Sequence, residues 1–389
     1  MCALRWPPPT FFDNLLDETH VALRQSARRF AEAEIAPHAA RWEADGIFPR
    51  ELYKKAAAAG LLGVGFPEEL GGVGGSPLHA MMLIEGMMRG GSTGVSVGLG
   101  SLGIALPPIV QWKDPALIDR YVRPTLAGDT IACLAVTEPD TGSDVAGIKT
   151  RATRDGDHYV VTGNKLFITS GTRADVIVTL ARTGADPHGG LSFFVLEPTM
   201  PGVTVSRALT KTGWCASDTA ELAFDAVRVP VANRVGPEGS AFLTLMKNFV
   251  VERLALAAYG AVTAEIALEE AARYARERQA FGRPIAGFQV TRHKLADMAT
   301  RVLAAKTLVY QVAARLERGE QPLAEVAMVK NLCSDIAHEV TWEAVQIHGG
   351  MGFMRETLVE RLSRDARLLP IGGGTSEIMK EIIAKQLGL

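Results

Sequence analysis

The spacing of hydrophobic positions changes twice along the chain and divides it into three regions. From about residue 15 to 130 the apolar residues recur at helical spacing, for example over 19–40 and 50–59. From about 131 to 238 short apolar and β-branched runs predict strands. From about 240 to the end the helical spacing returns. The pattern predicts a helical region, a β region and a second helical region.

The middle region contains the clearest strand signals. Two β-rich runs, 158–162 and 165–169, flank Gly163-Asn164, a pair that favours a tight turn, so the sequence predicts a hairpin there. Further short runs continue the pattern at 176–180, 191–196, 203–205 and 219–224. Several short strands at close spacing predict a small barrel or sandwich.

The last region consists of long periodic segments joined by short links. The predicted helices are 240–278, 288–318, 323–347, 358–368 and 375–387. Such an arrangement is typical of an antiparallel four-helix bundle. The fold class is therefore α+β. The expected domains are an all-α domain over 1–130, a β domain over 131–238 and a helical bundle over 239–389.

Composition and charge exclude several functional classes. The 389 residues are 47% hydrophobic and 22% charged with a formal net charge of −2, which provides no general attraction to nucleic acid or an acidic membrane. No apolar run reaches the roughly 20 residues that span a bilayer, so stable membrane insertion is not expected. Residues 1–10 lack a signal or clear transit peptide and suggest a short ordering or docking arm, or disorder.

The cysteine positions bear on metal binding and on the compartment. Cys2, Cys133, Cys215 and Cys333 are widely scattered, which argues against a zinc site and against a disulfide framework. We therefore expect no metal site and a reducing compartment, most simply a bacterial-type cytoplasm.

Two common motifs occur in contexts that do not suit them. Residues 98–103 match the Gly-x-Gly-x-x-Gly dinucleotide pattern, but they follow a helical segment and no βαβ unit surrounds them. Residues 90–94 match Gly-x-Ser-x-Gly without a preceding strand. Close packing of small residues explains both motifs better, and the apolar stretch 86–103 indicates a tightly packed helix pair or a pocket wall.

The segment from Thr137 to Asp144, Thr-Glu-Pro-Asp-Thr-Gly-Ser-Asp, is a candidate ligand loop just before the β region. Its glycine, serine and threonine residues offer backbone N–H groups and hydroxyls to a phosphate or a flavin edge. A surface turn is the plainer explanation, because these residue types also form turns. The charge of Asp140 would be unfavourable near a phosphate.

Glu252 is the strongest candidate for acid–base chemistry. It lies inside the long helical run, next to Arg253 and among apolar residues such as Phe249 and Leu256. An acid inside a helix usually lies on the solvated face or in an ion pair, but neighbours in sequence do not face each other on a helix. A carboxylate that loses solvent when substrate arrives rises from a pKa of about 4.3 toward neutrality, where a general base works best.

Together, Glu252-Arg253 and the run Gly372-Gly373-Gly374-Thr375-Ser376-Glu377-Ile378 resemble the acyl-CoA dehydrogenases. Glu277-Arg278-Gln279-Ala280-Phe281-Gly282-Arg283 and Gln346-Ile347-His348-Gly349-Gly350 resemble further signatures of that family. In many members the catalytic base directly precedes Gly-Thr-Ser-Glu-Ile, where this chain has Gly373. The isovaleryl and long-chain members instead carry the base in the helical Glu-Arg pair, which here is Glu252.

The resemblance implies a three-domain fold, FAD and the α,β-dehydrogenation of a long-chain or methyl-branched fatty acyl-CoA. It implies Glu252 as base and the Gly373 backbone N–H as an oxyanion donor. The implied substrate contacts are Ser143, Phe249, Arg253 and Gly374. The implied cofactor contacts are Leu134, Val136, Thr137, Gly142, Ser143, Phe167, Ile168, Thr169, Arg278, Phe281, Gln289, Gln346, Gly349, Gly350, Thr375 and Glu377.

The resemblance also implies partners: an acyl-CoA substrate, an electron-transferring flavoprotein as acceptor, and a homotetramer built as a dimer of dimers. In relatives the phenylalanine at position 281 reaches an adenine held mainly by the neighbouring subunit. Two other functions remain open from the sequence. One is an acyl-CoA oxidase or flavin monooxygenase that passes electrons to O2, and the other is a flavin-bearing scaffold without catalysis.

Overall fold

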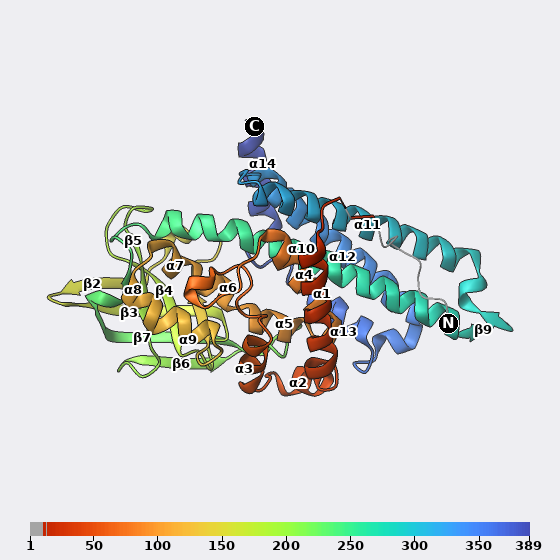
Figure 1. Cartoon of the computed structure of the whole chain (residues 1–389), viewed down its shortest axis with the longest axis horizontal. Helices are drawn as coiled ribbons and strands as arrows, with labels where there is room; N and C mark the ends of the chain where they lie inside the picture. The colour runs from red at the N-terminus through yellow and green to blue at the C-terminus, as the bar shows by residue number, and fades with distance from the viewer. Residues whose placement is uncertain (1–10, 13) are drawn as a thin grey trace.

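The computed structural model describes residues 11, 12 and 14–389, and the arm expected at 1–10 lies outside the described residues. Nine helices of the described N-terminal region precede the sheet (Figure 1). They are α1 Glu18–Phe30, α2 Ala39–Asp45, α3 Glu51–Ala58, α4 Pro77–Met87, α5 Thr93–Gly100, α6 Leu102–Ala105, α7 Pro107–Trp112, α8 Pro115–Leu117 and α9 Arg123–Leu126.

The helix predicted over 19–40 divides into two. Helix α1 continues into a π-helical turn at Ala31–Ile35, and α2 begins only at Ala39. Pro37 lies between them and has no backbone N–H with which to continue the helix. The break therefore has a local cause in the sequence.

The middle region is one sheet with the strand order β6-β7-β3-β2-β4-β5-β8, and β1 pairs in parallel with β4. The strands are β1 Ala132–Ala135, β2 Arg151–Asp155, β3 His158–Thr169, β4 Val176–Arg182, β5 Leu191–Leu196, β6 Val203–Ala208, β7 Thr219–Pro230 and β8 Arg234–Val235. Side chains from β1 to β5 and from β7 form one core, so the sheet curls around its inner face. Its outer face packs on the N-terminal helices.

The hairpin predicted around Gly163-Asn164 is wrong. These residues lie within the continuous strand β3 and pair with Phe224 and Ala223 of β7, next to a register shift at Val161. A Cβ on Gly163 would lie 2.4 Å from Oγ1 of Thr150, so the glycine permits a close approach rather than a turn.

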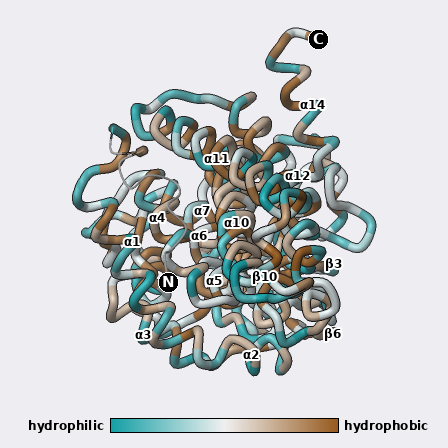
Figure 2. Tube along the Cα trace, turned by 90° about the vertical axis from the view of Figure 1, so that its right-hand side faces the viewer, coloured by the Kyte–Doolittle hydropathy of each residue, from teal (hydrophilic) through white to brown (hydrophobic). Residues whose placement is uncertain are grey.

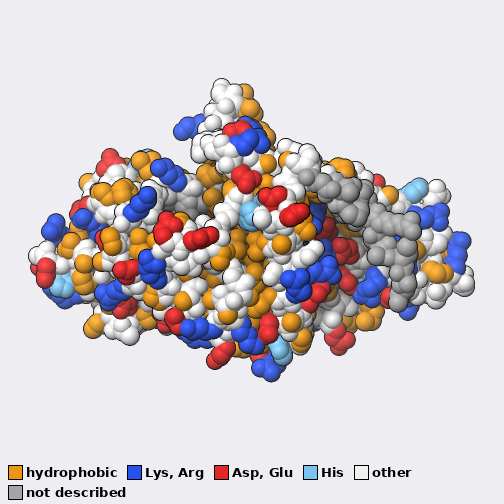
Figure 3. Space-filling view, viewed as in Figure 1, with side chains coloured by type: hydrophobic (Ala, Val, Ile, Leu, Met, Phe, Trp, Pro, Cys, Tyr) orange, Lys and Arg blue, Asp and Glu red, His pale blue; other side chains and the backbone are white. Residues whose placement is uncertain are grey.

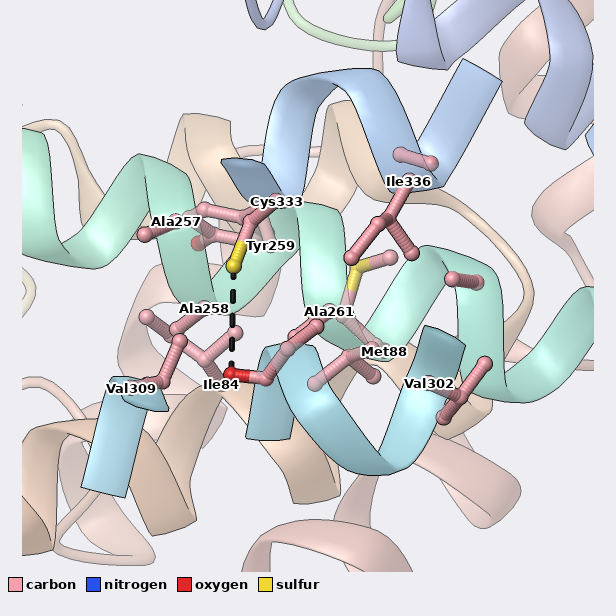
Figure 4. Close-up of a cluster of buried hydrophobic side chains, with 14 of the residues drawn as sticks. Ile84, Met88, Ala257, Ala258, Tyr259, Ala261, Val302, Val309, Cys333 and Ile336 are labelled. Carbon is pink, nitrogen blue, oxygen red and sulfur yellow. Dashed lines mark hydrogen bonds between the residues drawn. The ribbon is translucent and has the colours of Figure 1, made fainter. Parts of the chain in front are cut away.

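The C-terminal region has three long helices, α10 Ala241–Glu277, α11 Gln289–Glu317 and α12 Leu323–His348, followed by α13 Leu358–Ala366 and α14 Ser376–Leu387. Helix α10 starts over the sheet and crosses the molecule to the short ribbon of β9 Gln279–Ala280 and β10 Arg283–Pro284 (Figure 1). The three long helices share a hydrophobic core with α4, to which Ala257 and Ala261 of α10, Val302 of α11 and Cys333 of α12 contribute (Figure 4). Such burial is the main source of helix stability in a protein of this kind.

Helix α14 stands out from the body of the molecule (Figures 2 and 3). Met379 is its only fully buried residue, and Leu387 is 60% exposed. A projecting amphipathic helix of this kind needs a further surface to cover its apolar side chains.

The apolar segment 93–112 is long and hydrophobic enough to qualify as a membrane span, contrary to the expectation from the sequence. In the structure it is divided among α5, α6 and α7, and 67% of its apolar window is buried. A Cβ on Gly98 would lie 2.5 Å from the Phe48 ring, and one on Gly94 would lie 2.9 Å from Oε1 of Glu43. The small residues of this segment therefore serve close packing.

Candidate active site

Glu252 lies in the N-terminal half of α10 and has a carboxylate oxygen, Oε2, with neither solvent contact nor a hydrogen-bond partner in the described structure. The residue as a whole is only half-buried, so part of the side chain remains accessible. Burial raises the pKa of Glu252 from 4.5 to about 7, although the positive charges of Arg253 and Lys330 oppose this rise. An unpartnered carboxylate with a near-neutral pKa suits a general base better than a structural ion pair.

The glycine run before α14 meets α10 at this carboxylate. A Cβ on Gly373 would lie 3.5 Å from Oε1 of Glu252 and 3.9 Å from Cγ of Arg253. The fold therefore brings positions 252 and 373, which are distant in sequence, to one point. A side chain at position 373 would start where the Glu252 carboxylate ends.

The conformation of this turn requires glycine. Gly373 has a φ of +64° and Gly374 a φ of +96°, in the region that residues with a Cβ rarely adopt. A Cβ on Gly373 would also lie 2.6 Å from Cδ1 of Leu256. The Gly373 N–H donates to no acceptor within the described part of the chain, which leaves it free for a ligand oxygen.

Three of the four expected substrate contacts surround Glu252. Nε of Arg253 donates to the Gly373 carbonyl at 3.1 Å, and its guanidinium lies 5.4 Å from the centre of the Phe249 ring. Gly374 follows in the same turn, and a Cβ on it would lie 3.7 Å from Nη2 of Arg253. Ser143 lies on an exposed loop and makes no hydrogen bond to this group among the described residues.

A buried ion pair fixes the start of the loop Thr137–Asp144. Nζ of Lys165, a fully buried β3 residue, donates to Oε1 of Glu138 at 2.9 Å and to the Val136 carbonyl at 2.8 Å. The Glu138 carboxylate also accepts the backbone N–H groups of Lys149 and Thr150. The loop therefore has a rigid base, while Gly142 and Ser143 at its tip remain exposed.

The concern about Asp140 has a structural answer. Its carboxylate is exposed and pairs with Nζ of Lys149 at 2.9 Å, and the side-chain hydrogen bond and charge of Lys149 lower its pKa. Asp140 is also absent from the residues with positive φ. Aspartate at this position therefore imposes no unusual backbone on the loop, and its charge is compensated within the loop.

Phe167 is held out of the core by its backbone. It has a φ of +62° at a bulge of β3 between Lys165 and Ile168, and it is 65% exposed. A bulky residue in this region is strained and often marks a ligand site. Ile168 is buried beneath it, and Thr169 is half-buried with no side-chain hydrogen bond in the described residues.

The exposed side chains of this region fit a flavin. An exposed aromatic face at Phe167 and free hydroxyls at Thr169 and Ser143 match a flat ring with a polar edge. Leu134 is half-buried and Val136 buried on β1 and just after it, and Thr137 begins the loop. Thr375 caps α14 by accepting the Ile378 N–H, and Glu377 is exposed in its first turn.

The other expected cofactor residues lie at the far end of the bundle. Arg278 ends α10, about 39 Å of helix rise beyond Glu252. Phe281 is 95% exposed in the β9–β10 turn, and Gln289 starts α11. Gln346 lies in the last turn of α12, and Gly349 and Gly350 directly follow that helix, with no atom within 4 Å of a Cβ built on either glycine. The expected cofactor residues therefore form two separate groups within one chain.

One cluster of potential metal ligands occurs among the described residues, formed by Asp17, His20 and His79. Asp17 and His20 form a capping box at the start of α1, and Ser76 and His79 form one at the start of α4. Nε2 of His79 lies 2.9 Å from Oγ1 of Thr19. Helix capping explains these contacts without an ion.

Two of the buried lysines escaped the sequence analysis. Lys165 falls on the same side of β3 as Tyr159 and Val161, so the alternation of the strand could have indicated its burial. Lys330 falls at helical spacing among apolar residues of 323–347 and is fully buried. A charged residue on the apolar face of a predicted helix indicates a buried polar contact.

Known proteins resemble the chain along almost its full length. Family models described as the N-terminal, middle and C-terminal domains of acyl-CoA dehydrogenase match residues 17–129, 133–227 and 240–388. The mitochondrial long-chain specific acyl-CoA dehydrogenase of Sus scrofa is 36% identical over 376 residues, which cover 96% of this chain and 87% of that protein.

Two solved structures extend the comparison. A probable acyl-CoA dehydrogenase from Mycobacterium abscessus is 52% identical with a TM-score of 0.95, and the match covers 96% of this chain and all of that one. A glutaryl-CoA dehydrogenase from Mycobacterium smegmatis in complex with FADH2 is 26% identical with a TM-score of 0.91, covering 97% of this chain and 96% of that one.

Proposed function

The chain belongs to the acyl-CoA dehydrogenase family, and from this premise we propose that it uses FAD to oxidise a fatty acyl-CoA to the trans-2-enoyl-CoA. The observation that carries this proposal is that the Glu252 carboxylate lies beside position 373, where glycine has no side chain to act as a base. Long-chain or methyl-branched acyl groups are the proposed substrates, supported by the similarity to the long-chain enzyme of Sus scrofa.

In this mechanism Glu252 removes the α-proton of the thioester. Its Oε2 is unpartnered and its pKa of about 7 leaves a large fraction ionised at neutral pH, so it can accept a proton without first breaking an ion pair. Arg253 holds the adjoining Gly373 carbonyl rather than the carboxylate, which keeps the base free.

The Gly373 N–H supplies a hydrogen bond to the thioester carbonyl. Because this N–H has no acceptor in the described structure, it can stabilise the charge that develops on the oxygen as the proton leaves. When bound, FAD supplies the acceptor for the hydride that leaves the β-carbon. Phe167, Thr169 and the tip of the loop at Ser143 are the residues proposed to hold its flavin end.

We further propose a homotetramer that passes electrons to an electron-transferring flavoprotein. The distance between the two groups of cofactor residues supports assembly, because Arg278, Phe281 and Gly349 need a site from another subunit to complete them. The exposed Phe281 and Phe353, 95% and 79% accessible, support contact with a second chain.

Anaerobic titration of the FAD-loaded protein with saturated acyl-CoAs, both straight and branched, tests this function. Bleaching of the flavin by one class of chain is the expected result and identifies the substrate class. Absence of bleaching by every acyl-CoA, with a flavin that dithionite still reduces, would overturn the proposal. Rapid O2 consumption without a flavoprotein acceptor would favour an oxidase instead.

The rate of flavin reduction should depend on pH through Glu252. Only the ionised carboxylate accepts a proton, so the rate should rise about tenfold per pH unit below about pH 7 and level off above it. Stopped-flow measurement of flavin reduction across this range checks the prediction. A midpoint near 4.5, the ordinary value for glutamate, would contradict the buried state of this base.

Moving the base back to position 373 should restore part of the lost activity. In a Glu252→Gln background, Gly373→Glu introduces a carboxylate on a side chain whose Cβ lies 3.5 Å from the former Oε1. We expect recovery of about tenfold over Glu252→Gln alone, limited by the positive φ and by the 2.6 Å contact with Leu256. Adding Leu256→Ala should increase the recovery, and single-turnover flavin reduction measures it.

A further inference from the structure

Lys330 is a buried charge that the mechanism above does not use. It lies in the middle of α12, its side chain is fully buried, and Nζ donates to the Gly374 carbonyl at 2.5 Å. Burying an ammonium group costs free energy unless the charge is paired or hydrogen-bonded. A lysine on the apolar face of a helix therefore indicates a specific role for its charge. No ion pair within 4 Å satisfies it among the described residues.

Lys330 and Arg253 hold two successive carbonyl groups of the glycine turn. Nε of Arg253, from α10, donates to the Gly373 carbonyl at 3.1 Å, and Lys330, from α12, holds the next carbonyl at Gly374. Two cations from two helices thus hold successive peptide groups of the turn that carries the free Gly373 N–H. With φ values of +64° and +96° this turn has no side chains of its own to fix it.

The charged groups around Lys330 come from two other helices. Glu252 and Arg253 lie on α10, and Glu377 lies in the first turn of α14. Burial and the charge of Arg253 lower the pKa of Lys330 to about 8, while Glu252 and Glu377 favour its charged form. Its own charge in turn favours ionised Glu252.

We propose that Lys330 is a positioning residue for catalysis, which fixes the Gly373–Gly374 turn through the Gly374 carbonyl and supports the ionised form of the base. This inference rests on the proposed function, because it assigns Lys330 a part in the same reaction. Lys330 acts through Gly374 and Glu252, and it does not need to touch the substrate.

Two variants separate its two effects. Lys330→Met removes the hydrogen bond and the charge, whereas Lys330→Gln keeps a donor for the Gly374 carbonyl and removes only the charge. Lys330→Met should slow flavin reduction about 10- to 100-fold with little change in substrate affinity, because the turn is misplaced only in the reacting complex. The acid limb of the pH profile is the range in which flavin reduction slows because Glu252 becomes protonated. Both variants should shift this limb upward, on the order of one pH unit, because a cation near Glu252 is lost.

Asn331 provides the matched control. Its Nδ2 donates to the Ser376 carbonyl at 3.1 Å, so it also ties α12 to the start of α14 but carries no charge. Asn331→Leu should therefore leave the acid limb in place. FAD content and circular dichroism establish that each variant is folded, and Lys330→Gln serves if Lys330→Met does not fold.

The outcomes distinguish this inference from the proposed function. If acyl-CoA reduces the wild-type flavin, but Lys330→Met reacts at the wild-type rate or the acid limb of Lys330→Gln coincides with that of the wild type, the corresponding part of the role, fixing the turn or supporting the ionised base, is overturned while the proposed function stands. The role is also overturned if Asn331→Leu shifts the limb as far as Lys330→Gln does. If acyl-CoA does not reduce the wild type at all, the proposed function itself fails.

Discussion

Replacing Glu252 by glutamine is expected to slow flavin reduction by acyl-CoA about 1,000-fold or more while leaving FAD bound. Glutamine has nearly the same size and preserves the packing on α10, but its amide cannot accept the α-proton. Position 373, which approaches Glu252, is glycine and offers no carboxylate in its place. Stopped-flow absorbance of the flavin under anaerobic conditions measures the loss.

The matched control is Glu270→Gln, on the same helix. Glu270 pairs with Arg273 at the surface and lies far along α10 from the glycine turn, so its loss should leave the rate within a factor of about two. Glu252→Asp should retain a small part of the activity, because a shorter side chain keeps the charge but loses reach. Wild-type rates in Glu252→Gln would require a different base.

Replacing Lys165 by methionine is expected to destabilise the protein by about 3–5 kcal/mol and to weaken FAD binding. The change leaves Glu138 as a buried carboxylate without its cation. Burial opposes ionisation of Glu138, yet Lys165 and the hydrogen bonds from Thr150 and Lys149 together hold its pKa below the ordinary value. Without Lys165 the loop Thr137–Asp144 loses the buried ion pair that fixes its position, and with it the support of the loop tip. Denaturant unfolding and an FAD titration measure the two effects.

Lys149→Met is the control for that change, because Lys149 belongs to an ion pair of the same loop. The Lys149–Asp140 pair is exposed on both sides and screened by solvent, so its loss should leave the unfolding midpoint close to that of the wild type. Equal effects of Lys149→Met and Lys165→Met would mean that burial of the Glu138–Lys165 pair does not support the loop.

Much of the fold could be predicted because hydrophobic spacing is a local property. The long helices near 240–278, 288–318 and 323–347 appear within a few residues as α10, α11 and α12, since each has an uninterrupted apolar face. The hairpin at Gly163-Asn164 failed for the opposite reason. A Gly-Asn pair signals a turn locally, but here the glycine accommodates Thr150, a neighbour that only the folded sheet provides.

Sequence motifs could predict the residues of the candidate site but not their arrangement in space. Glu252 and Gly373 could be named from their sequence contexts. Their proximity in space, the free Gly373 N–H and the crowding of position 373 by Leu256 depend on how α10 and the turn before α14 meet. Phe167 could be named as part of a strand, but its left-handed backbone and exposure depend on a bulge opposite β7. The separation of Arg278 from Glu252, by contrast, could be predicted, because the helix expected over 240–278 already places them at opposite ends of its C-terminal part.

Exchange of the α-hydrogen tests the central claim most directly, because it isolates proton removal from flavin reduction. An acyl-CoA whose β-carbon is replaced by sulfur has no β-hydride to lose, yet it retains the α-protons that a base can exchange with deuterated water. The FAD-loaded wild type is expected to exchange them, and Glu252→Gln is expected not to do so above the uncatalysed rate. Exchange by Glu252→Gln at the wild-type rate would contradict the assignment of Glu252 as the base.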